Sequence, residues 1–478
     1  MPEPPDLSRY AASRAHQARA HRRIPGGAHT YAKGDDQMPE AMPVVIARGE
    51  GCRVWDLDGN AYIEYGMGLR SVTLGHAEPR VTAAVSDWLA RGVNFSRPAS
   101  VELAAAEAFL AMLPTADRVK FCKDGSSATT AAVKLARAAT GRDVVAFCHD
   151  HPFLSADDWF IGATAMDAGI PESVRELSIG FPYGDLDALA ALLDDRGREI
   201  ACVILEPTRG ADDATAYLAG VRELCTRHGC AMVLDEMITG MRWANGGAQT
   251  GFGVVPDLTT FGKALANGFS VSALAGRAEL MDRGGLGTPH DRVFLLSATH
   301  GAETHALAAC VETQRIYREE DVAGRLAQQG ARLREGVAAQ VARHGVDGFF
   351  GTAGHDSNLV FYTRDPDGNA SQPYRTLFLQ EMVRRGILGP SFVISAAHTD
   401  DAVDATVEAV GDALGVYAQA LDAGTTDGLL VGRPVQPVFR RRAGLVWSSP
   451  PPALPAVPSG DGTALAGTPD LTPRPESR

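Results

Sequence analysis

Short apolar runs alternate with stretches of helical periodicity through the middle of the chain. Three such runs are GRDVVAFC (141–148), REIACVILEP (198–207) and GCAMVLDE (229–236). The segment VRELCTRHG has apolar residues at helical spacing, and we expect it to end at Gly229, because glycine readily adopts the left-handed conformation that closes a helix. This alternation of strands and helices predicts an α/β fold with a largely parallel sheet.

Mixed patterns flank this α/β middle. A helix is predicted over residues 8–23 and short strands over residues 43–66. Helical, Ala-rich sequence runs from Glu303 to about Val341, and residues 398–414 repeat apolar positions at helical spacing after a Thr that can cap the helix. Because chain termini often lie close together, we expect the two ends to combine into one second domain.

The patterns predict a division of the chain into five parts. A smaller α+β domain takes residues 1–65 and 316–420, and a large domain takes residues 66–315. Residues 421–447 form an extension that either docks on the body or acts as a proline-rich linker. Residues 448–478 are proline-rich with almost no large apolar side chains, so they cannot bury enough surface to offset the entropy of ordering, and we predict disorder.

Composition and charge narrow the class of partner. The 478 residues are 45% hydrophobic and 22% charged, as in ordinary soluble proteins. The net charge of −13 argues against general nucleic-acid binding, which needs a basic face. No apolar run approaches the ~18 residues of a membrane span, and the N-terminus lacks the apolar core of a secretory signal. The seven cysteines show no dense spacing, and Cys225 and Cys230, five apart, have no second pair at metal-ligand spacing, which fits reduced thiols in a cytoplasmic protein.

Three polar residues follow apolar runs of the predicted sheet. Glu206 follows ACVIL, Asp235 follows AMVL, and Lys263 follows LTTFG. In open α/β sheets, ligands bind beyond the carboxyl ends of the strands. Each residue alone fits a solvated strand end or a structural ion pair. Two acids and an amine together call for a joint explanation.

A fourth feature is an anion-binding signal in KDGSSATTAAVKLARAATG (123–141). Gly125 lets the backbone approach a ligand closely, and the hydroxyls and free N–H groups of a first helical turn can hold an anion; a plain serine N-cap is the alternative. Together the parts suit pyridoxal phosphate, which needs a lysine for a Schiff base, an acid facing its pyridine nitrogen and a phosphate cup. A pKa lowered by desolvation would free the lysine amine to attack.

Several motifs resemble the class III aminotransferases of the fold type I pyridoxal-phosphate superfamily, and among them the glutamate-1-semialdehyde 2,1-aminomutases and their aminotransferase relatives. LDEMITGMR matches the family's Asp-Glu-x-x-Thr-Gly-x-Arg motif, and PDLTTFGKALANGFSVSALAGRAELM matches its lysine motif. The similarity runs from about Arg23 to Ala418. It implies a large domain with a mostly parallel, seven-stranded type of sheet flanked by helices, and a smaller α+β domain built from both termini.

The resemblance also implies roles for single residues. Lys263 would form the Schiff base and shuttle the proton, and Asp235 would pair with the pyridine nitrogen. Met237 would pack on a face of the ring, unless it only fills the core. Gly125 and Ser126 would hold the phosphate.

Two further roles follow from the resemblance. Glu206 would stand near the cofactor. Thr299 would reach the phosphate bound by a neighbouring subunit, which implies a homodimer with shared active sites.

The sequence departs from the family pattern at the loop after residue 148. The family has aromatic-His-Gly there, and this chain has FCHDHPFLSADDWF. His149, His151 or Phe153 could cover the ring, and ring stacking or substrate contact explains the two histidines without a metal. At the phosphate loop, Ser127 stands where the family usually has Glu.

A second departure concerns the substrate. The aminomutases hold the substrate carboxylate with an arginine near the N-terminus, where this chain reads HTYAKG. Lys33 is one substitute, although Lys and Arg are not equivalent for a carboxylate, and Arg70 is another.

The altered substrate region favours an aminotransferase. It would move an amino group from an amino-acid donor to an aldehyde or ketone, such as an oxidised sugar or cyclitol of secondary metabolism, by a ping-pong route. An intramolecular aminomutase is the alternative. The intact lysine, acid and phosphate-loop motifs speak against a third reading, a non-catalytic scaffold.

Overall fold

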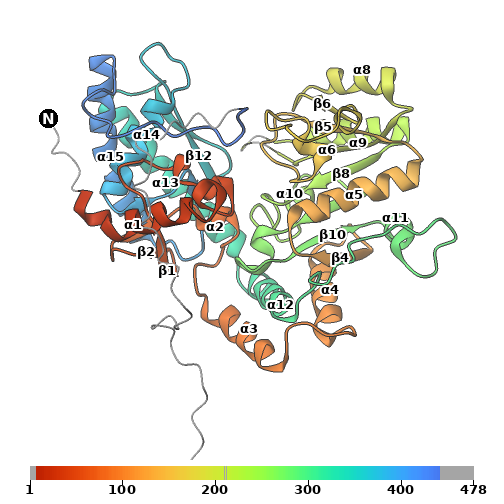
Figure 1. Ribbon diagram of the computed structural model, residues 1–478. Helices are drawn as coiled ribbons and strands as arrows, with labels where there is room; N and C mark the ends of the chain where they lie inside the picture. The colour runs from red at the N-terminus through yellow and green to blue at the C-terminus, as the bar shows by residue number, and fades with distance from the viewer. Residues whose placement is uncertain (1–6, 209, 211–212, 442–478) are drawn as a thin grey trace, which may run out of the picture. The chain divides into compact units, whose positions relative to one another are not determined.

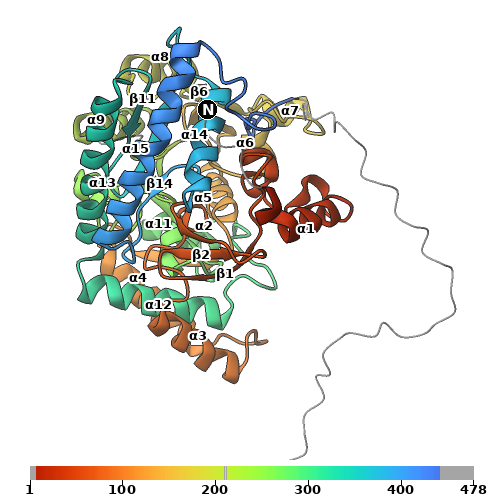
Figure 2. The ribbon, with the colours of Figure 1, turned by 90° about the vertical axis from the view of Figure 1, so that its left-hand side faces the viewer.

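The computed structural model describes residues 7–208, 210 and 213–441 (Figures 1 and 2). The predicted disordered tail, residues 448–478, and the last part of the predicted extension lie outside the described residues. Within the described ranges, no helix is long and apolar enough to cross a membrane.

Seven strands form the largest sheet, in the order β4-β10-β9-β8-β7-β5-β6. β9, β8, β7, β5 and β6 pair in parallel, and β10 runs antiparallel to both of its neighbours. The prediction of an α/β fold with a mostly parallel seven-stranded sheet is confirmed. The strands are β4 (Arg118–Cys122), β5 (Val144–Cys148), β6 (Ser178–Phe181), β7 (Ile200–Leu205), β8 (Ala231–Asp235), β9 (Leu258–Phe261) and β10 (Ser272–Gly276).

β5 and β7 are apolar along their whole length, and β8 is apolar up to Asp235, as expected for strands with both faces of the sheet covered. On β8, Val233 packs in the cluster formed with α5 (Gly125–Thr140), which lies across the sheet in Figure 1. Met232 and Leu234 pack in the cluster formed with α8 (Leu186–Arg196) and α9 (Thr215–His228) on the other face. As expected, α9 ends at Gly229, whose φ is 64°.

Two smaller sheets lie outside the large one. β1 (Ile46–Glu50), β2 (Arg53–Asp56) and β3 (Ala61–Glu64) form a sheet that is completed by β13 (Ile387–Leu388), paired parallel to β3. β11 (Phe350–Ala353), β12 (Asn358–Thr363) and β14 (Phe392–Val393) form the third sheet. Strands from both ends of the chain therefore share a sheet, although the domain boundaries given above remain a prediction.

Helices cover these smaller sheets. α15 packs on both α13 and α14 (Figure 2), and the Thr399 hydroxyl caps it by accepting a hydrogen bond from the Ala402 amide at 3.3 Å. The predicted helix from residue 303 to 341 is two helices, α12 and α13, because the backbone turns extended at Glu320. The remaining bounds are α1 (Ala11–His21), α2 (Met67–Arg70), α3 (Pro79–Arg91), α4 (Ser100–Met112), α6 (Asp158–Ile161), α7 (Glu172–Arg175), α10 (Ala248–Gly251), α11 (Ala278–Met281), α12 (Thr304–Glu319), α13 (Val322–His344), α14 (Gln372–Arg384) and α15 (Asp400–Ala423).

The described part of the extension contacts the N-terminal segment. The Arg440 guanidinium donates to the Asp36 carboxylate at 2.5 Å, and the Gln436 amide donates to the Asp36 carbonyl at 2.9 Å. Arg433 forms an ion pair with Glu40 at 3.2 Å. Segments from opposite ends of the chain are thus joined by both charge and backbone hydrogen bonds.

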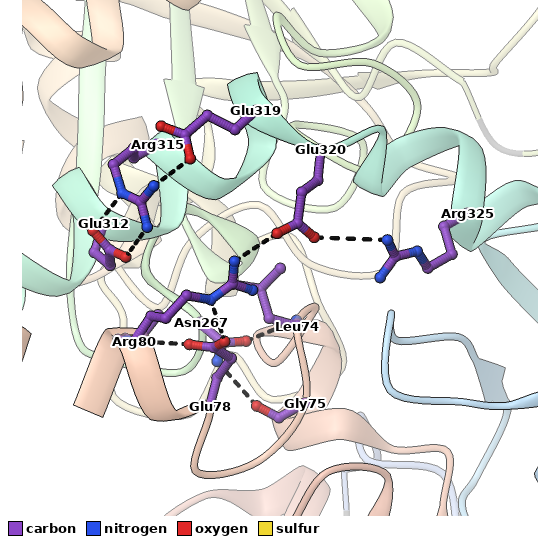
Figure 3. Close-up of polar contacts among 11 residues, drawn as sticks. Leu74, Gly75, Glu78, Arg80, Asn267, Glu312, Arg315, Glu319, Glu320 and Arg325 are labelled. Atoms are coloured by element: carbon purple, nitrogen blue, oxygen red, sulfur yellow. Dashed lines mark hydrogen bonds and ion pairs between the residues drawn. The ribbon is translucent and has the colours of Figure 1, made fainter. Parts of the chain in front are cut away.

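A buried asparagine joins the loop after β9 to the loop before α3 (Figure 3). Asn267 has a φ of 46°, a left-handed conformation that Asn tolerates better than most residues. Its Oδ1 accepts from the Leu74 amide at 2.9 Å, and its Nδ2 donates to the Gly75 carbonyl at 3.0 Å. Nearby, Arg80 pairs with Glu78 at 2.7 Å and with Glu320 at 2.5 Å, which joins α3 to the end of α12.

Replacing Asn267 with Ala should lower the free energy of unfolding of the cofactor-free protein by about 1–3 kcal/mol, because a buried N–H and a buried C=O lose their partners. Urea unfolding measures this difference. Asn267→Asp keeps the acceptor for Leu74 but turns a carboxylate oxygen toward the Gly75 carbonyl in a buried position, so it should cost at least as much as the Ala variant. An Ala variant as stable as the parent would show that the two loops do not depend on this side chain.

Candidate active site

Three polar residues lie at the ends of three adjacent parallel strands. Asp235 is the last residue of β8, Glu206 follows β7, and Lys263 lies two residues beyond β9. Because β9, β8 and β7 are consecutive neighbours in the sheet, the three residues share its carboxyl edge, where the sequence placed a ligand site.

Asp235 is a buried acid with an incomplete set of partners. Its side chain is 2% exposed, and its Oδ1 accepts from the Met237 amide and from the Thr260 hydroxyl, both at 3.0 Å. Burial raises the pKa of Asp235 to about 6, and the nearby Lys263 charge and these hydrogen bonds oppose the rise. A cation placed against this carboxylate would stabilise its charged form.

Lys263 has an unusual backbone conformation and an amine whose pKa is lowered. Its backbone is left-handed, with a φ of 45°, which is rare for a residue other than glycine and typical of functional sites. Burial lowers its pKa, the carboxylates of Asp235 and Glu206 oppose that shift, and the charges of Arg70 and Arg242 reinforce it. Within the part of the chain that the structure describes, the Nζ atom makes no hydrogen bond or ion pair.

The loop before α5 forms a cradle of free backbone N–H groups. Asp124, and not a serine, caps the helix: its Oδ1 accepts from the Ser127 amide at 2.8 Å. The Ser126 hydroxyl accepts from the Ala156 amide at 2.9 Å. Among the described residues, the amides of Gly125 and Ser126 have no acceptor, so both are left for an anion such as a phosphate.

Two glycines leave room for Met237 between this cradle and the lysine. A Cβ atom on Gly125 would lie 2.8 Å from the Met237 sulfur, and one on Gly262 would lie 2.6 Å from the same atom. Met237 is therefore packed against both the phosphate cradle and the residue before Lys263. It also belongs to the core cluster around α5, so core packing and a role at the site are compatible for this residue.

The residues at this edge fit pyridoxal phosphate. The Lys263 amine is unpaired among the described residues and has a lowered pKa, as a group that condenses with an aldehyde requires. The buried Asp235 carboxyl lacks a cationic partner within ion-pair distance in the described ranges. The free amides before α5 suit the phosphate.

The structure separates the three candidates for the ring-covering residue. His149 is exposed and lies against Gly180 on the edge strand, and Phe153 is 46% exposed. His151 is buried, and its Nδ1 accepts from the Glu206 amide at 3.0 Å. Of the three, His151 is the one that contacts another predicted site residue. In the described ranges, no group of three His, Cys, Asp or Glu residues could hold a metal ion.

The predicted substrate and partner residues lie in different settings. Arg70 is partly buried, donates from Nε to Asn358 Oδ1 at 2.7 Å, and is close enough for its charge to act on Glu206 and Lys263. Lys33 is exposed in the 3₁₀ turn Tyr31–Lys33. Thr299 is exposed, and its carbonyl accepts from Asn94 Nδ2 at 2.9 Å.

Glu236 was not singled out from the sequence, although it follows Asp235 directly. It is fully buried and accepts hydrogen bonds from the Ala248 amide at 2.9 Å, the Gln249 amide at 2.7 Å and the Thr239 hydroxyl. Burial raises its pKa to about 7. The sequence signal that could have found Glu236 is a charged residue within an apolar stretch. In the structure its carboxylate fixes the loop that follows β8 by accepting these hydrogen bonds.

Known proteins share sequence with this chain over most of its length. The sequence profile of the family "Aminotransferase class-III" matches residues 31–348. The glutamate-1-semialdehyde 2,1-aminomutase of Chloroflexus aurantiacus is 34% identical over 428 residues, covering 84% of this chain and 96% of that protein.

Solved structures show the same fold. The FumI protein of Sphingopyxis sp. MTA144, solved with pyridoxal phosphate, is 29% identical with a TM-score of 0.78 over 88% of this chain and 99% of that one. An omega-transaminase from Sphaerobacter thermophilus is 26% identical with a TM-score of 0.77 over 87% and 100%.

The chain therefore belongs to the class III aminotransferases, enzymes of the fold type I class that use pyridoxal phosphate. The predictions of the family, the fold, the enzyme class and the cofactor are confirmed. The roles of the individual site residues remain predictions.

The raised pKa of Asp235 has a consequence for cofactor binding. Below about pH 6 the carboxyl is protonated and neutral, and above it the carboxylate can pair with a protonated pyridine nitrogen. The cofactor-free protein should therefore bind pyridoxal phosphate more weakly as the pH falls through about 6. Absorbance titration at a series of pH values measures the effect.

Asp235→Asn is the control for that titration, because the phosphate group also titrates near this pH. The Asn variant should bind at least about tenfold more weakly at pH 7, where the charged partner is lost, and should show a smaller dependence on pH. Identical pH profiles for the parent and the Asn variant would exclude Asp235 as the group responsible.

Proposed function

We propose that this protein is an aminotransferase that takes an amino group from an amino-acid donor and passes it to an aldehyde or ketone acceptor in two half-reactions. The observation that carries the proposal is the Lys263 amine, unpaired in the described residues and with a lowered pKa, beside the buried Asp235 carboxyl. This pair supports amine chemistry on pyridoxal phosphate.

Pyridoxal phosphate supplies an aldehyde that condenses with amines and a ring that withdraws electrons. We assign to Lys263 the tethering of the aldehyde and the movement of a proton to and from the substrate carbon, because a neutral amine can accept a proton and a charged one can return it. Asp235 would keep the pyridine nitrogen protonated by pairing with it. The Gly125 and Ser126 amides would hold the phosphate, and Met237 and His151 would lie beside the ring.

The charges around Lys263 support a substrate that carries an anionic group. Arg70 acts electrostatically on both Lys263 and Glu206, and its Nη1 atom has no partner among the described residues. A guanidinium offers two parallel donors to a carboxylate, which an ammonium such as that of Lys33 does not. We therefore assign the carboxylate of the amino-acid donor to Arg70.

The altered substrate region also bears on the acceptor. We propose a carbonyl compound of secondary metabolism, such as an oxidised sugar or cyclitol. The same family, however, includes relatives named as aminomutases, which supports the alternative that the amino group moves within one molecule.

A homodimer with shared sites is part of this proposal. Thr299 is exposed on the loop before α12, where it is available to a neighbouring subunit. Thr304, five residues on, fixes that loop by donating from its hydroxyl to the Gly92 carbonyl at 2.7 Å.

Lys263→Ala should abolish both the yellow colour of the purified protein and turnover, because Lys263 is the amine that lies at the carboxyl edge of the sheet with Asp235. Lys134→Ala, on the exposed face of α5, is the matched control and should keep both. Absorbance spectra and product assays measure the two properties. Full turnover by the Lys263 variant would refute the proposed chemistry.

Donor screening separates the transferase from the aminomutase. Treatment with the correct amino acid should bleach the yellow colour and release the matching keto acid. Conversion of a glutamate-1-semialdehyde-like substrate in the absence of any donor would instead favour the aminomutase.

A further inference from the structure

The short α2 segment has an unusual backbone. Met67, Gly68, Leu69 and Arg70 have consecutive φ values of 42°, 58°, 57° and 75°, all in the left-handed region. Left-handed conformation is unfavourable for each residue with a side chain, and within the segment Gly68 alone escapes that cost. Such a run persists only where surrounding structure holds it, and it is found mostly at functional sites.

Arg242 holds the end of this left-handed run. Its Nη2 donates to the Arg70 carbonyl at 2.9 Å. The other hydrogen bonds to the segment's backbone are local: the Arg70 amide donates to the Gly66 carbonyl and the Val72 amide to the Met67 carbonyl, both at 3.0 Å, and the Ser71 hydroxyl and amide donate to the Gly68 carbonyl at 2.7 and 3.4 Å. Among the described residues, Arg242 is therefore the group that fixes the segment to more distant parts of the chain through its backbone.

The Arg242 guanidinium is a charged group that is costly in free energy to bury. It is fully buried, and burial lowers its pKa to about 10. Its Nη1 donates to the Ser357 carbonyl at 3.1 Å and to the Ile394 carbonyl at 3.0 Å. In the described ranges it has no carboxylate within ion-pair distance, and its Nε has no acceptor. A buried charge without a counterion is costly. A role that only connects segments of the fold therefore does not explain why an arginine occupies this position.

The hydrogen bonds of Arg242 and those of Arg70 converge on two neighbouring residues, Ser357 and Asn358. Arg242 holds the Arg70 carbonyl and the Ser357 carbonyl. The Arg70 side chain in turn donates from Nε to Oδ1 of Asn358, the residue after Ser357, at 2.7 Å. One buried guanidinium thus fixes both the backbone that carries Arg70 and the strand that receives its side chain.

These hydrogen bonds leave part of the Arg70 guanidinium available to a ligand. Nη2 has one long contact, 3.4 Å to the Ser391 hydroxyl, and Nη1 has no partner in the part of the chain that the structure describes. The α2 segment that carries Arg70 contacts the 3₁₀ turn Lys263–Ala266, and the Arg70 charge lies near enough to Lys263 to lower its pKa. The available donors therefore belong to the same site as the reactive amine.

We propose that Arg242 is a positioning residue that sets the Arg70 guanidinium to bind the carboxylate of the substrate, acting through the Arg70 carbonyl and the strand that carries Asn358. The proposal rests on the function proposed above and deepens it. It makes the aspartate motif's arginine a determinant of substrate binding, although it does not touch the substrate.

The experiment compares two substrates on the protein loaded with pyridoxal phosphate. The first is the amino acid that bleaches the parent protein fastest, and the second is the amine that results when that amino acid loses its carboxylate. Arg70→Gln should lower kcat/KM for the amino acid by about 10- to 100-fold, the range for a lost charge-assisted hydrogen bond, and should change the amine by less than about threefold. Arg242→Met should show the same selective loss.

A double variant tests whether the two arginines act as a unit. Arg70→Gln with Arg242→Met should be no worse toward the amino acid than Arg70→Gln alone, because the positioning residue has nothing left to position. Additive losses would overturn the proposal. An equal loss toward the amino acid and the amine in Arg242→Met would also overturn it, since that pattern marks general damage.

Arg142 provides a matched control. Its Nη1 also donates to three backbone carbonyls, those of Gly197, Ile200 and His228, at 2.9–3.1 Å, and it precedes β5 at the edge of the sheet opposite the site. Arg142→Met should lower stability without changing the preference for the amino acid over the amine. A change in that preference would show that the assay reports stability.

Hydrogen exchange gives a readout that does not depend on activity. Amides of residues 67–72 should exchange faster in Arg242→Met than in the parent, and should be unchanged in Arg142→Met. If Arg242→Met does not fold, Arg242→Lys keeps the charge but not the fork of donors, and the same selective loss is expected in smaller measure.

The remaining outcomes are also decisive. Unchanged exchange and unchanged selectivity in the Lys variant would refute the positioning role. If the parent has the same kcat/KM for the amine as for the amino acid, Arg70 is not a carboxylate anchor. If the parent does not take up pyridoxal phosphate at all, the proposed function itself fails.

Discussion

The site depends on an amine, Lys263, and a carboxyl, Asp235, that lie at the same edge of the sheet and are not joined in an ion pair in the described ranges. Burial raises the pKa of Asp235 and lowers that of Lys263, so each group carries its charge less readily than it would in water. A cofactor with a basic nitrogen can pair with the carboxyl, and its aldehyde can react with the amine. The rest of the fold holds these two side chains in place.

The loops that keep this separation are fixed by polar side chains, not by the apolar core. Glu236 anchors the loop after β8 through backbone amides. Asn267 joins the lysine loop to the loop before α3. Arg242 ties the aspartate motif to the segment of Arg70. Each is buried, so each hydrogen bond is formed away from competing water and its loss leaves an unsatisfied group.

The sheet and its carboxyl edge could be predicted from the sequence because their signals are local. The apolar runs, the closing Gly229 and the motifs around Asp235 and Lys263 all lie within short windows. The fixing contacts could not be predicted, because Arg242 reaches partners 115 to 172 residues away. His149, His151 and Phe153 could not be separated either, since an irregular loop has no period that assigns a side chain to a face.

The most direct test is to identify the residue that carries the cofactor. Borohydride reduction of the yellow protein fixes the cofactor to its amine, and peptide mass spectrometry then locates it. The account predicts that the label lies on Lys263, and that Asp235→Asn weakens cofactor binding without moving the label. Labelling of Lys33 or Lys123 in place of Lys263 would contradict it.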